Sequence, residues 1–161
     1  MIDDAILAQA AALVARCRAA GVMVVTAESL TGGLIAAALS AIEGSSAVLD
    51  RGFVTYSNLA KHEMLGVPMA MITGHGAVSE AVTRAMAEGA LSRSRAQLAV
   101  AVTGMAGPGG GTADKPVGLV WFGCARAGQA TVVARQVFAG DRTAVRQATV
   151  AAAMAMLSAR I

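Results

Sequence analysis

The feature that most constrains this chain is the segment Thr26-Ala-Glu-Ser-Leu-Thr-Gly-Gly33, which joins two stretches of different character. An apolar run at residues 22–25 leads into it, and an alanine-rich run at residues 34–41 follows it. The apolar run predicts a buried strand and the alanine-rich run predicts a helix. Ser29, Thr31 and a pair of glycines therefore stand at a strand-to-helix turn, where α/β proteins place reactive or ligand-binding groups.

Ser29 has two interpretations at such a turn. Serine is a common helix N-cap, because its hydroxyl accepts a hydrogen bond from an amide of the first turn. It is a nucleophile when another side chain supplies a base. The pattern is not Gly-x-Ser-x-Gly, so the nucleophile elbow of the α/β-hydrolases is not supported. The amides of Thr31, Gly32 and Gly33 are expected to be free to hold an anion or a developing oxyanion.

Composition limits the class of protein. With 161 residues, the chain suits one domain spanning residues 1–161. Although 56% of its residues are hydrophobic, no run reaches the roughly 18 apolar residues that span a bilayer. Asp3 and Asp4 stand where a signal peptide would be basic, so a cytoplasmic protein is expected. A net charge of +3, with one Trp and one Tyr, gives no support for direct nucleic-acid binding.

The sequence predicts neither a metal site nor a cofactor. Cys17 and Cys124 are far apart and unclustered, as expected for reduced core thiols. His62 and His75 do not form a ligand pair with metal-binding spacing.

The order of the remaining elements predicts the fold class. Helices are expected at residues 3–20, 30–42, 58–65, 79–93 and 141–159, with Ser79 and Asp141 as caps of the last two. Strands are expected at residues 22–27, 48–56, 98–103, 117–126 and 131–138. This alternation predicts a single three-layer α/β/α domain, and the adjacent late strands make its β-sheet mixed.

A glycine-rich loop at residues 104–116 follows the third predicted strand and should lie at the carboxyl edge of the sheet. Glycines such as Gly104 and Gly107 let a backbone approach a ligand closely. The loop is no P-loop, because Lys115 is followed by Pro116. A flexible surface turn is the alternative, but a loop of this length without secondary structure is uncommon unless it binds something.

Three other side chains are candidates because of where they fall. Tyr56 ends a predicted strand, and Lys61 follows near the start of the next helix. A lysine in a chain with few charges can be desolvated, which lowers its pKa and makes it a base; the alternative is an exposed lysine. Arg142 falls in the first turn of the last helix, where the dipole disfavours a cation. It indicates an anionic ligand such as phosphate, unless Asp141 neutralises it.

Six segments occur in an order that resembles the CinA C-terminal domain family, the nicotinamide-nucleotide amidohydrolases. The resemblance covers the chain from about residue 5 to residue 157. The segments are Ala27-Glu-Ser-Leu-Thr-Gly-Gly33, Gly44-Ser-Ser46, Arg51-Gly-Phe-Val-Thr-Tyr-Ser-Asn58 with Ala60-Lys61, Gly74-His-Gly-Ala-Val-Ser-Glu80, Thr103-Gly-Met-Ala-Gly-Pro-Gly-Gly-Gly-Thr112 with Lys115-Pro-Val-Gly118, and Gly140-Asp-Arg142.

The resemblance implies a three-layer α/β/α fold and an enzyme that deamidates nicotinamide mononucleotide (NMN) to nicotinic acid mononucleotide and ammonia. It implies a homodimer that needs no metal or cofactor. Ser29 matches the nucleophile, Lys61 its base, and Tyr56 a residue that supports the lysine and the substrate. Substrate contacts are expected from Thr31, Gly32, Gly33, Ser46, Thr103, Gly104, Gly107 and Arg142.

Two other classes stay open at this point. The family name comes from competence and DNA damage, so one alternative is a nucleotide-binding or partner-binding module with little turnover. The other is a phosphate-handling enzyme that uses the glycine-rich loop. That enzyme would need a cluster of carboxylates to hold a metal, and Asp50, Asp114 and Asp141 are far apart in the sequence.

Overall fold

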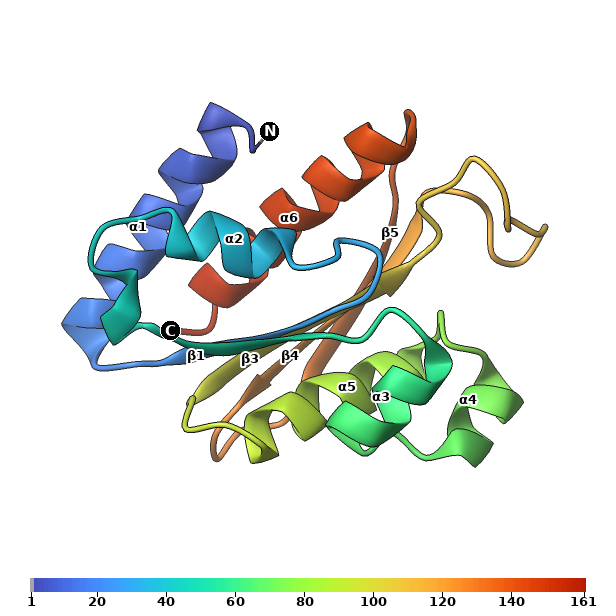
Figure 1. Ribbon diagram of the computed structural model, residues 1–161, viewed down its shortest axis with the longest axis horizontal. Coiled ribbons are helices and arrows are strands. Elements are labelled where there is room, and N and C mark those ends of the chain that lie inside the picture. The colour runs from blue at the N-terminus through green and yellow to red at the C-terminus, as the bar shows by residue number, and fades with distance from the viewer. Residues whose placement is uncertain (1) are drawn as a thin grey trace.

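One mixed sheet of five strands lies at the centre of residues 2–161, which the computed structural model describes (Figure 1). The strands are β1 (Val24–Glu28), β2 (Leu49–Val54), β3 (Leu98–Gly104), β4 (Leu119–Arg126) and β5 (Val132–Val137). Their spatial order is β2-β1-β3-β4-β5. β1 is parallel to β2 and β3, whereas β4 is antiparallel to both β3 and β5. The predicted mixed α/β sheet is confirmed.

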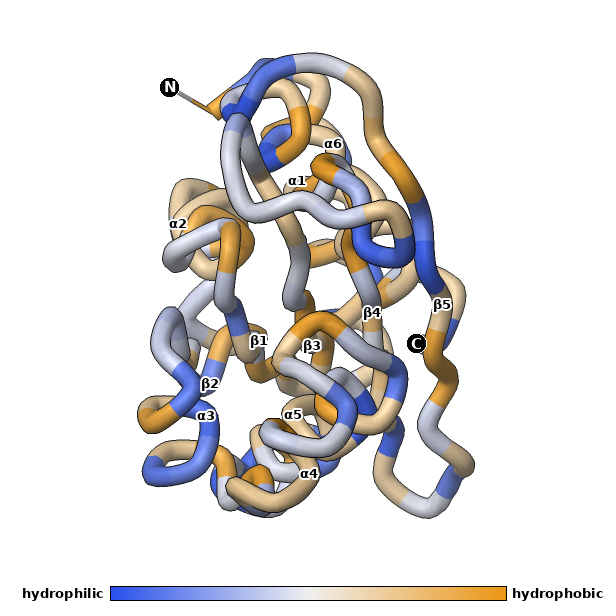
Figure 2. Tube along the Cα trace, turned by 90° about the vertical axis from the view of Figure 1, so that its right-hand side faces the viewer, coloured by the Kyte–Doolittle hydropathy of each residue, from blue (hydrophilic) through white to orange (hydrophobic). Residues whose placement is uncertain are grey.

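Helices cover both faces of this sheet, so the predicted three layers are confirmed. One face carries α1 (Asp4–Ala20), α2 (Leu34–Ser40) and α6 (Arg142–Ser158), and the other carries α3 (Asn58–Leu65), α4 (Met69–His75) and α5 (Glu80–Ser92). Figure 2 shows β1 and β3 between these two layers of helices. No helix within residues 2–161 has both the length and the apolar character that a membrane span requires.

The central strands are apolar on both faces because both faces are covered. Successive side chains of a strand point to opposite sides, so Val24 packs with α1, α2 and α6 while Val25 packs with α3, α4 and α5. In β3, Val100 packs on the same side as Val24 and Ala101 packs on the same side as Val25. Such strands appear in the sequence as continuous apolar runs, which is why the sequence predicts both β1 and β3 as buried strands.

Two elements differ from the sequence-based expectation. The second helix begins at Leu34 rather than at residue 30, because Gly32 and Gly33 adopt positive φ values of 60° and 101° that keep the preceding residues in a turn. The short helix α4 has no counterpart among the predicted helices; it begins after Pro68 and buries only Ile72. The predicted caps Ser79 and Asp141 are confirmed, since their side chains accept from the amides of Val82 and Ala144.

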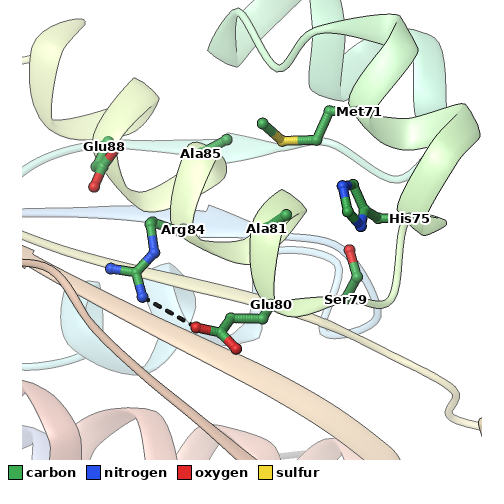
Figure 3. Close-up of a pocket in the computed structure, with 8 residues that line it drawn as sticks. All are labelled: Met71, His75, Ser79, Glu80, Ala81, Arg84, Ala85 and Glu88. Atoms are coloured by element: carbon green, nitrogen blue, oxygen red, sulfur yellow. Dashed lines mark hydrogen bonds and ion pairs between the residues drawn. The ribbon is translucent and has the colours of Figure 1, made fainter.

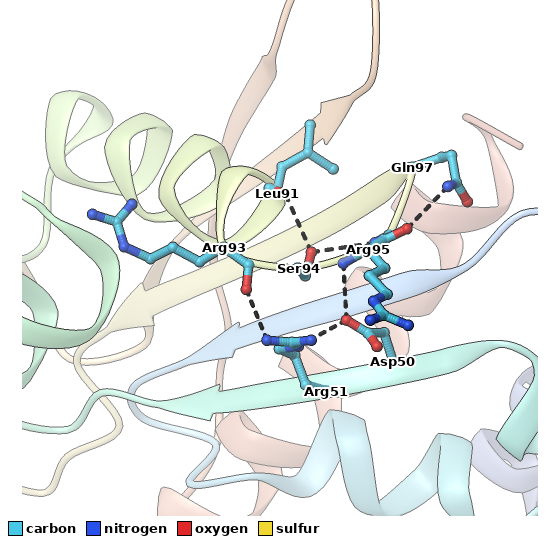
Figure 4. A network of polar contacts seen from close by, with 8 residues as sticks. Asp50, Arg51, Leu91, Arg93, Ser94, Arg95 and Gln97 are labelled. Atoms are coloured by element: carbon cyan, nitrogen blue, oxygen red, sulfur yellow. Dashed lines mark hydrogen bonds and ion pairs between the residues drawn. The ribbon is translucent and has the colours of Figure 1, made fainter.

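A polar network fastens the edge strand β2 to the connection between α5 and β3 (Figure 4). The Asp50 carboxylate accepts from Arg51 Nε at 2.7 Å and from the Arg95 amide at 3.0 Å, and Arg51 Nη1 donates to Arg93 O at 3.0 Å. The hydrogen bond from the Arg95 amide to the Asp50 carboxylate is the main reason that the pKa of Asp50 is lowered. This network lies at the amino ends of β2 and β3, which leaves their carboxyl ends for the turns described next.

Candidate active site

Ser29 and Lys61 meet at the carboxyl edge of the sheet. Ser29 directly follows β1, and its amide donates to Val102 O of β3 at 3.1 Å, which ties the turn to the sheet. Its Oγ lies 3.0 Å from Lys61 Nζ. Ser29 is not the cap of α2, because Gly33 occupies the N-cap position. The hydroxyl is therefore available for chemistry.

Lys61 is buried in α3 with 1% of its surface exposed, so the alternative of an exposed helix-start lysine is excluded. Burial lowers its pKa from 10.5 to about 8. Its Nζ also lies 2.8 Å from Thr55 O and 3.5 Å from Tyr56 O. A neutral amine has two N–H groups, which can face these carbonyls, and one lone pair, which then faces Ser29 Oγ. This geometry suits a base for the serine.

A cavity of about 270 Å³ opens above this pair. Of the predicted site residues, those that line it are Ser29, Lys61, Tyr56, Thr103, Gly104, Gly107 and Arg142. They come from α3, from the carboxyl ends of β1, β2 and β3 with the segments that follow them, and from the start of α6. Asn58 also lines the cavity and was not predicted, because a polar residue at the start of a helix has a structural explanation in the sequence.

Arg142 frames the mouth of this cavity together with the tyrosine and the glycine-rich loop. Its Nη2 donates to Tyr56 Oη at 2.8 Å, and its Nη1 donates to Gly107 O at 2.9 Å. Tyr56 is 59% exposed, so its ring stands at the entrance while its carbonyl faces Lys61. A guanidinium has five N–H groups, so Arg142 keeps donors for an anionic ligand.

Thr103 and Gly104 form the wall at the end of β3. Thr103 is buried, and its hydroxyl donates to Ala77 O at 3.1 Å. A Cβ at Gly104 would lie 2.6 Å from Leu119 O. Glycine is therefore required there by the close approach of β4, whatever its contact with a ligand.

Thr31, Gly32 and Gly33 lie beside the cavity rather than in its lining. The buried Thr31 hydroxyl donates to Glu28 Oε2 at 2.7 Å. The Gly33 amide donates to the same oxygen at 3.1 Å, and the Gly32 amide donates to Ser29 O at 3.0 Å. The expectation that the Gly32 and Gly33 amides are free for an oxyanion needs correction, because both already have acceptors within the turn.

Ser46 lies at the other end of the sheet. It is exposed in a 3₁₀ turn, Ser45–Ala47, which comes just before β2. Ser29 comes just after β1, and β1 and β2 are parallel. The two serines are therefore at opposite edges, and Ser46 does not line the cavity in this chain.

A larger cavity of about 450 Å³ lies against α4 and α5 (Figure 3). Three of its polar side chains are engaged in structural contacts: Ser79 Oγ donates to Gly76 O at 2.7 Å, and Glu80 pairs with Arg84 at 3.2 Å. Among the described side chains that line it, no nucleophile has a base within hydrogen-bond distance. The smaller cavity is therefore the candidate active site. Across residues 2–161, no three His, Cys, Asp or Glu side chains gather in a way that could hold a metal ion.

The fold and the site together define an α/β protein with a serine–lysine pair at the carboxyl edge of a mixed sheet. The sequence profile of the CinA C-terminal domain matches residues 7–161, and the chain belongs to this family.

The chain is similar to two curated proteins named nicotinamide-nucleotide amidohydrolase PncC. It is 56% identical to the one from Enterobacter agglomerans over 132 residues, 82% of this chain and 80% of that protein. It is 51% identical to the one from Escherichia coli K12 over 140 residues, 87% of this chain and 85% of that protein. The competence/damage inducible protein CihA from Agrobacterium tumefaciens has a solved structure with a TM-score of 0.96 and 50% identity, covering 99% of this chain and 97% of that one.

Proposed function

We propose that this chain is an amidohydrolase that converts NMN and water to nicotinic acid mononucleotide and ammonia. The observation that carries the proposal is the 3.0 Å distance between Ser29 Oγ and the buried Lys61 Nζ. This pair lies in a chain that is 56% and 51% identical to two proteins named nicotinamide-nucleotide amidohydrolase.

In the first half-reaction, neutral Lys61 takes the Ser29 hydroxyl proton as Oγ bonds to the carboxamide carbon of the nicotinamide ring. The tetrahedral intermediate then breaks its C–N bond. Lys61 gives the proton to the departing nitrogen, which leaves as ammonia. The carbonyls of Thr55 and Tyr56 keep the amine oriented during both transfers.

In the second half-reaction, water attacks the ester formed with Ser29 and gives a proton to Lys61. The bond between the carbonyl carbon and Ser29 Oγ breaks, and the proton returns from Lys61 to Oγ. The product leaves as a carboxylic acid that has gained one oxygen from the water, and it releases its remaining proton to solvent to become the carboxylate. One base thus serves both halves of the reaction, and no metal is required.

The oxyanion needs a donor other than the Gly32 and Gly33 amides, and we assign this role to the Leu30 amide. Leu30 lines the cavity, and its N–H donates to no residue within 2–161. Ser29 O of the same peptide unit accepts from Gly32, which fixes the plane of that unit. The Leu30 N–H points away from that carbonyl, because the peptide is planar and trans.

Arg142 is proposed to bind the phosphate, with Tyr56 and the glycine-rich loop around the ribose. Binding energy from this remote end would orient the carboxamide at Ser29 and favour the nucleotide over free nicotinamide. Further contacts from Thr31, Gly32, Gly33, Ser46, Thr103, Gly104 and Gly107 remain predictions. So do the single domain of residues 1–161, the homodimer and the cytoplasmic location.

The test is ammonia release from NMN by the wild type, Ser29→Ala and Lys61→Met. Each variant is expected to lose roughly 1,000-fold or more in kcat, because the nucleophile and its base act as a unit. Ser79→Ala is the matched control, since this serine only caps α5, and it should keep wild-type turnover. Near-wild-type kcat in either site variant would overturn the pair. NMN binding without ammonia release by the wild type would favour the nucleotide-binding module instead.

A further inference from the structure

Arg146 holds the turn that follows the proposed nucleophile. This arginine lies one helical turn beyond Arg142 on α6 and is partly buried. Its Nε donates to Leu30 O and its Nη2 donates to Thr31 O, both at 3.0 Å. A planar guanidinium that binds two successive carbonyls fixes the peptide units that carry them.

Glu28 holds the same turn by accepting hydrogen bonds from the donor groups of the turn and of the start of α2. The carboxylate is fully buried and accepts from the Thr31 hydroxyl and from the amides of Gly33, Ile35 and Ala36. These amides belong to the N-terminal turn of α2 and its cap, where a negative charge is favoured by the helix dipole. The turn is therefore held from two directions, with its carbonyls bound by Arg146 and its donors bound by Glu28.

The contacts of Arg146 lead to Ser29 through planar peptide units. Thr31 O, which binds Arg146, shares its peptide unit with the Gly32 N–H. That N–H donates to Ser29 O, which shares its unit with the Leu30 N–H. Fixing Thr31 O thus fixes the plane that carries Ser29 O. The positive charge of Arg146 at Thr31 O also strengthens the hydrogen bond from the Gly32 N–H to Ser29 O.

We propose that Arg146 is a positioning residue for the reaction, which holds Ser29 Oγ against Lys61 and aims the Leu30 amide by binding the carbonyls of Leu30 and Thr31. This inference rests on the proposed function. In this proposal α6 supports two parts of the site. It places Arg142 at the mouth of the cavity and Arg146 against the turn that follows Ser29. Figure 1 shows α6 lying beside α2, the helix that this turn begins.

The test compares Arg146→Met with Arg160→Met in the full-length protein. Arg160 also donates to backbone carbonyls, those of Cys124 and Ala130, but it does so near the amino end of β3, away from Ser29. Both variants lose a guanidinium that binds main chain, so both lose stability. Only Arg146→Met is expected to lose kcat for NMN, by about 100-fold, with KM within about threefold of wild type.

Two further measurements separate positioning from folding. The pH at which kcat is half-maximal should not move in Arg146→Met, because burial and not the contact with Ser29 lowers the pKa of Lys61. Arg146→Lys should recover part of kcat, since an ammonium can reach one carbonyl but cannot bind both as a fork does. Circular dichroism at the assay temperature checks that each variant is folded.

The outcomes distinguish this inference from the proposed function. If the wild type releases no ammonia, or Ser29→Ala keeps its turnover, the proposed function fails and the inference falls with it. If the wild type is active and Ser29→Ala is inactive, wild-type kcat in folded Arg146→Met or Arg146→Lys overturns the inference alone. An equal loss of kcat in Arg160→Met would also overturn it, because the effect would then be general destabilisation.

Discussion

Lys61 Nζ lies 3.0 Å from Ser29 Oγ, although the two residues are 32 positions apart and stand on different elements. Burial is the cause of the lowered pKa of Lys61. The contact therefore joins a hydroxyl to an amine that can lose its proton near neutral pH. Such a pair has the geometry and the proton affinity that a serine nucleophile needs.

The first prediction concerns the pH dependence of turnover. The base must be neutral, and the pKa of Lys61 is about 8, so kcat should rise with pH through about 8 and then level off. Below this range kcat should fall about tenfold per pH unit. Ammonia release at saturating NMN between pH 6 and pH 10 measures this. A flat profile across that range would contradict the role of Lys61 as base.

The second prediction concerns stability. The pKa of Lys61 is lower in the folded state than its ordinary value of 10.5, so folding disfavours the charged form. Below about pH 8 this penalty is fully present. As pH rises toward 10.5 the folded state loses its proton first, so the unfolded state binds more protons and stability rises. The free energy of unfolding of the wild type, relative to Lys61→Met, should therefore increase by roughly 3 kcal/mol across this range.

Urea unfolding of both proteins at matched pH values measures that difference. Every other titrating group is common to the two proteins, so the change in the difference reports on Lys61 alone. At pH 7 Lys61→Met is spared the cost of a buried ammonium, although it leaves Thr55 O without its donor. A difference that stays constant from pH 7 to pH 10.5 would show that the amine is not buried as described.

The third prediction concerns Gly104. A Cβ there would lie 2.6 Å from Leu119 O and 2.9 Å from Val120 Cγ2, so Gly104→Ala must push β4 away from β3. We expect the free energy of unfolding to fall by about 2 kcal/mol or more. Gly74→Ala is the control, because nothing lies within 4 Å of its Cβ position and alanine favours the helix. Equal thermal stability of the two variants would rule out this explanation of Gly104.

The fold was largely predictable because its signals are local. The central strands are buried on both faces and appear as apolar runs, while Ser79 and Asp141 mark helix starts by their capping chemistry. The helix Met69–His75 was missed since it buries only one side chain, Ile72, and so has no periodic apolar pattern. Its position depends on packing against α3 and α5, which the sequence of the segment does not encode.

The site was predictable only where residue type reveals chemistry. A serine in a strand-to-helix turn, a lysine in a chain of few charges and an arginine at a helix start are visible as candidates. The partners that hold them are not visible, since Arg146 reaches Leu30 O from 116 positions away. The engagement of the Gly33 amide by Glu28 was also hidden, because a buried carboxylate and an exposed one look alike in a sequence.

The last prediction separates the two roles of Arg142. Its Nη2 donates to Tyr56 Oη at 2.8 Å, so Tyr56→Phe frees one N–H group without removing the charge. If the guanidinium binds phosphate, Arg142→Ala should raise KM for NMN by about tenfold or more with a smaller effect on kcat. Tyr56→Phe should raise KM by only about two- to threefold, since the arginine is less firmly placed but still charged. In the double variant, the tyrosine change should add nothing, because its partner is gone. An additive loss would mean that Tyr56 contacts the substrate independently, and an unchanged KM in Arg142→Ala would remove the arginine from phosphate binding.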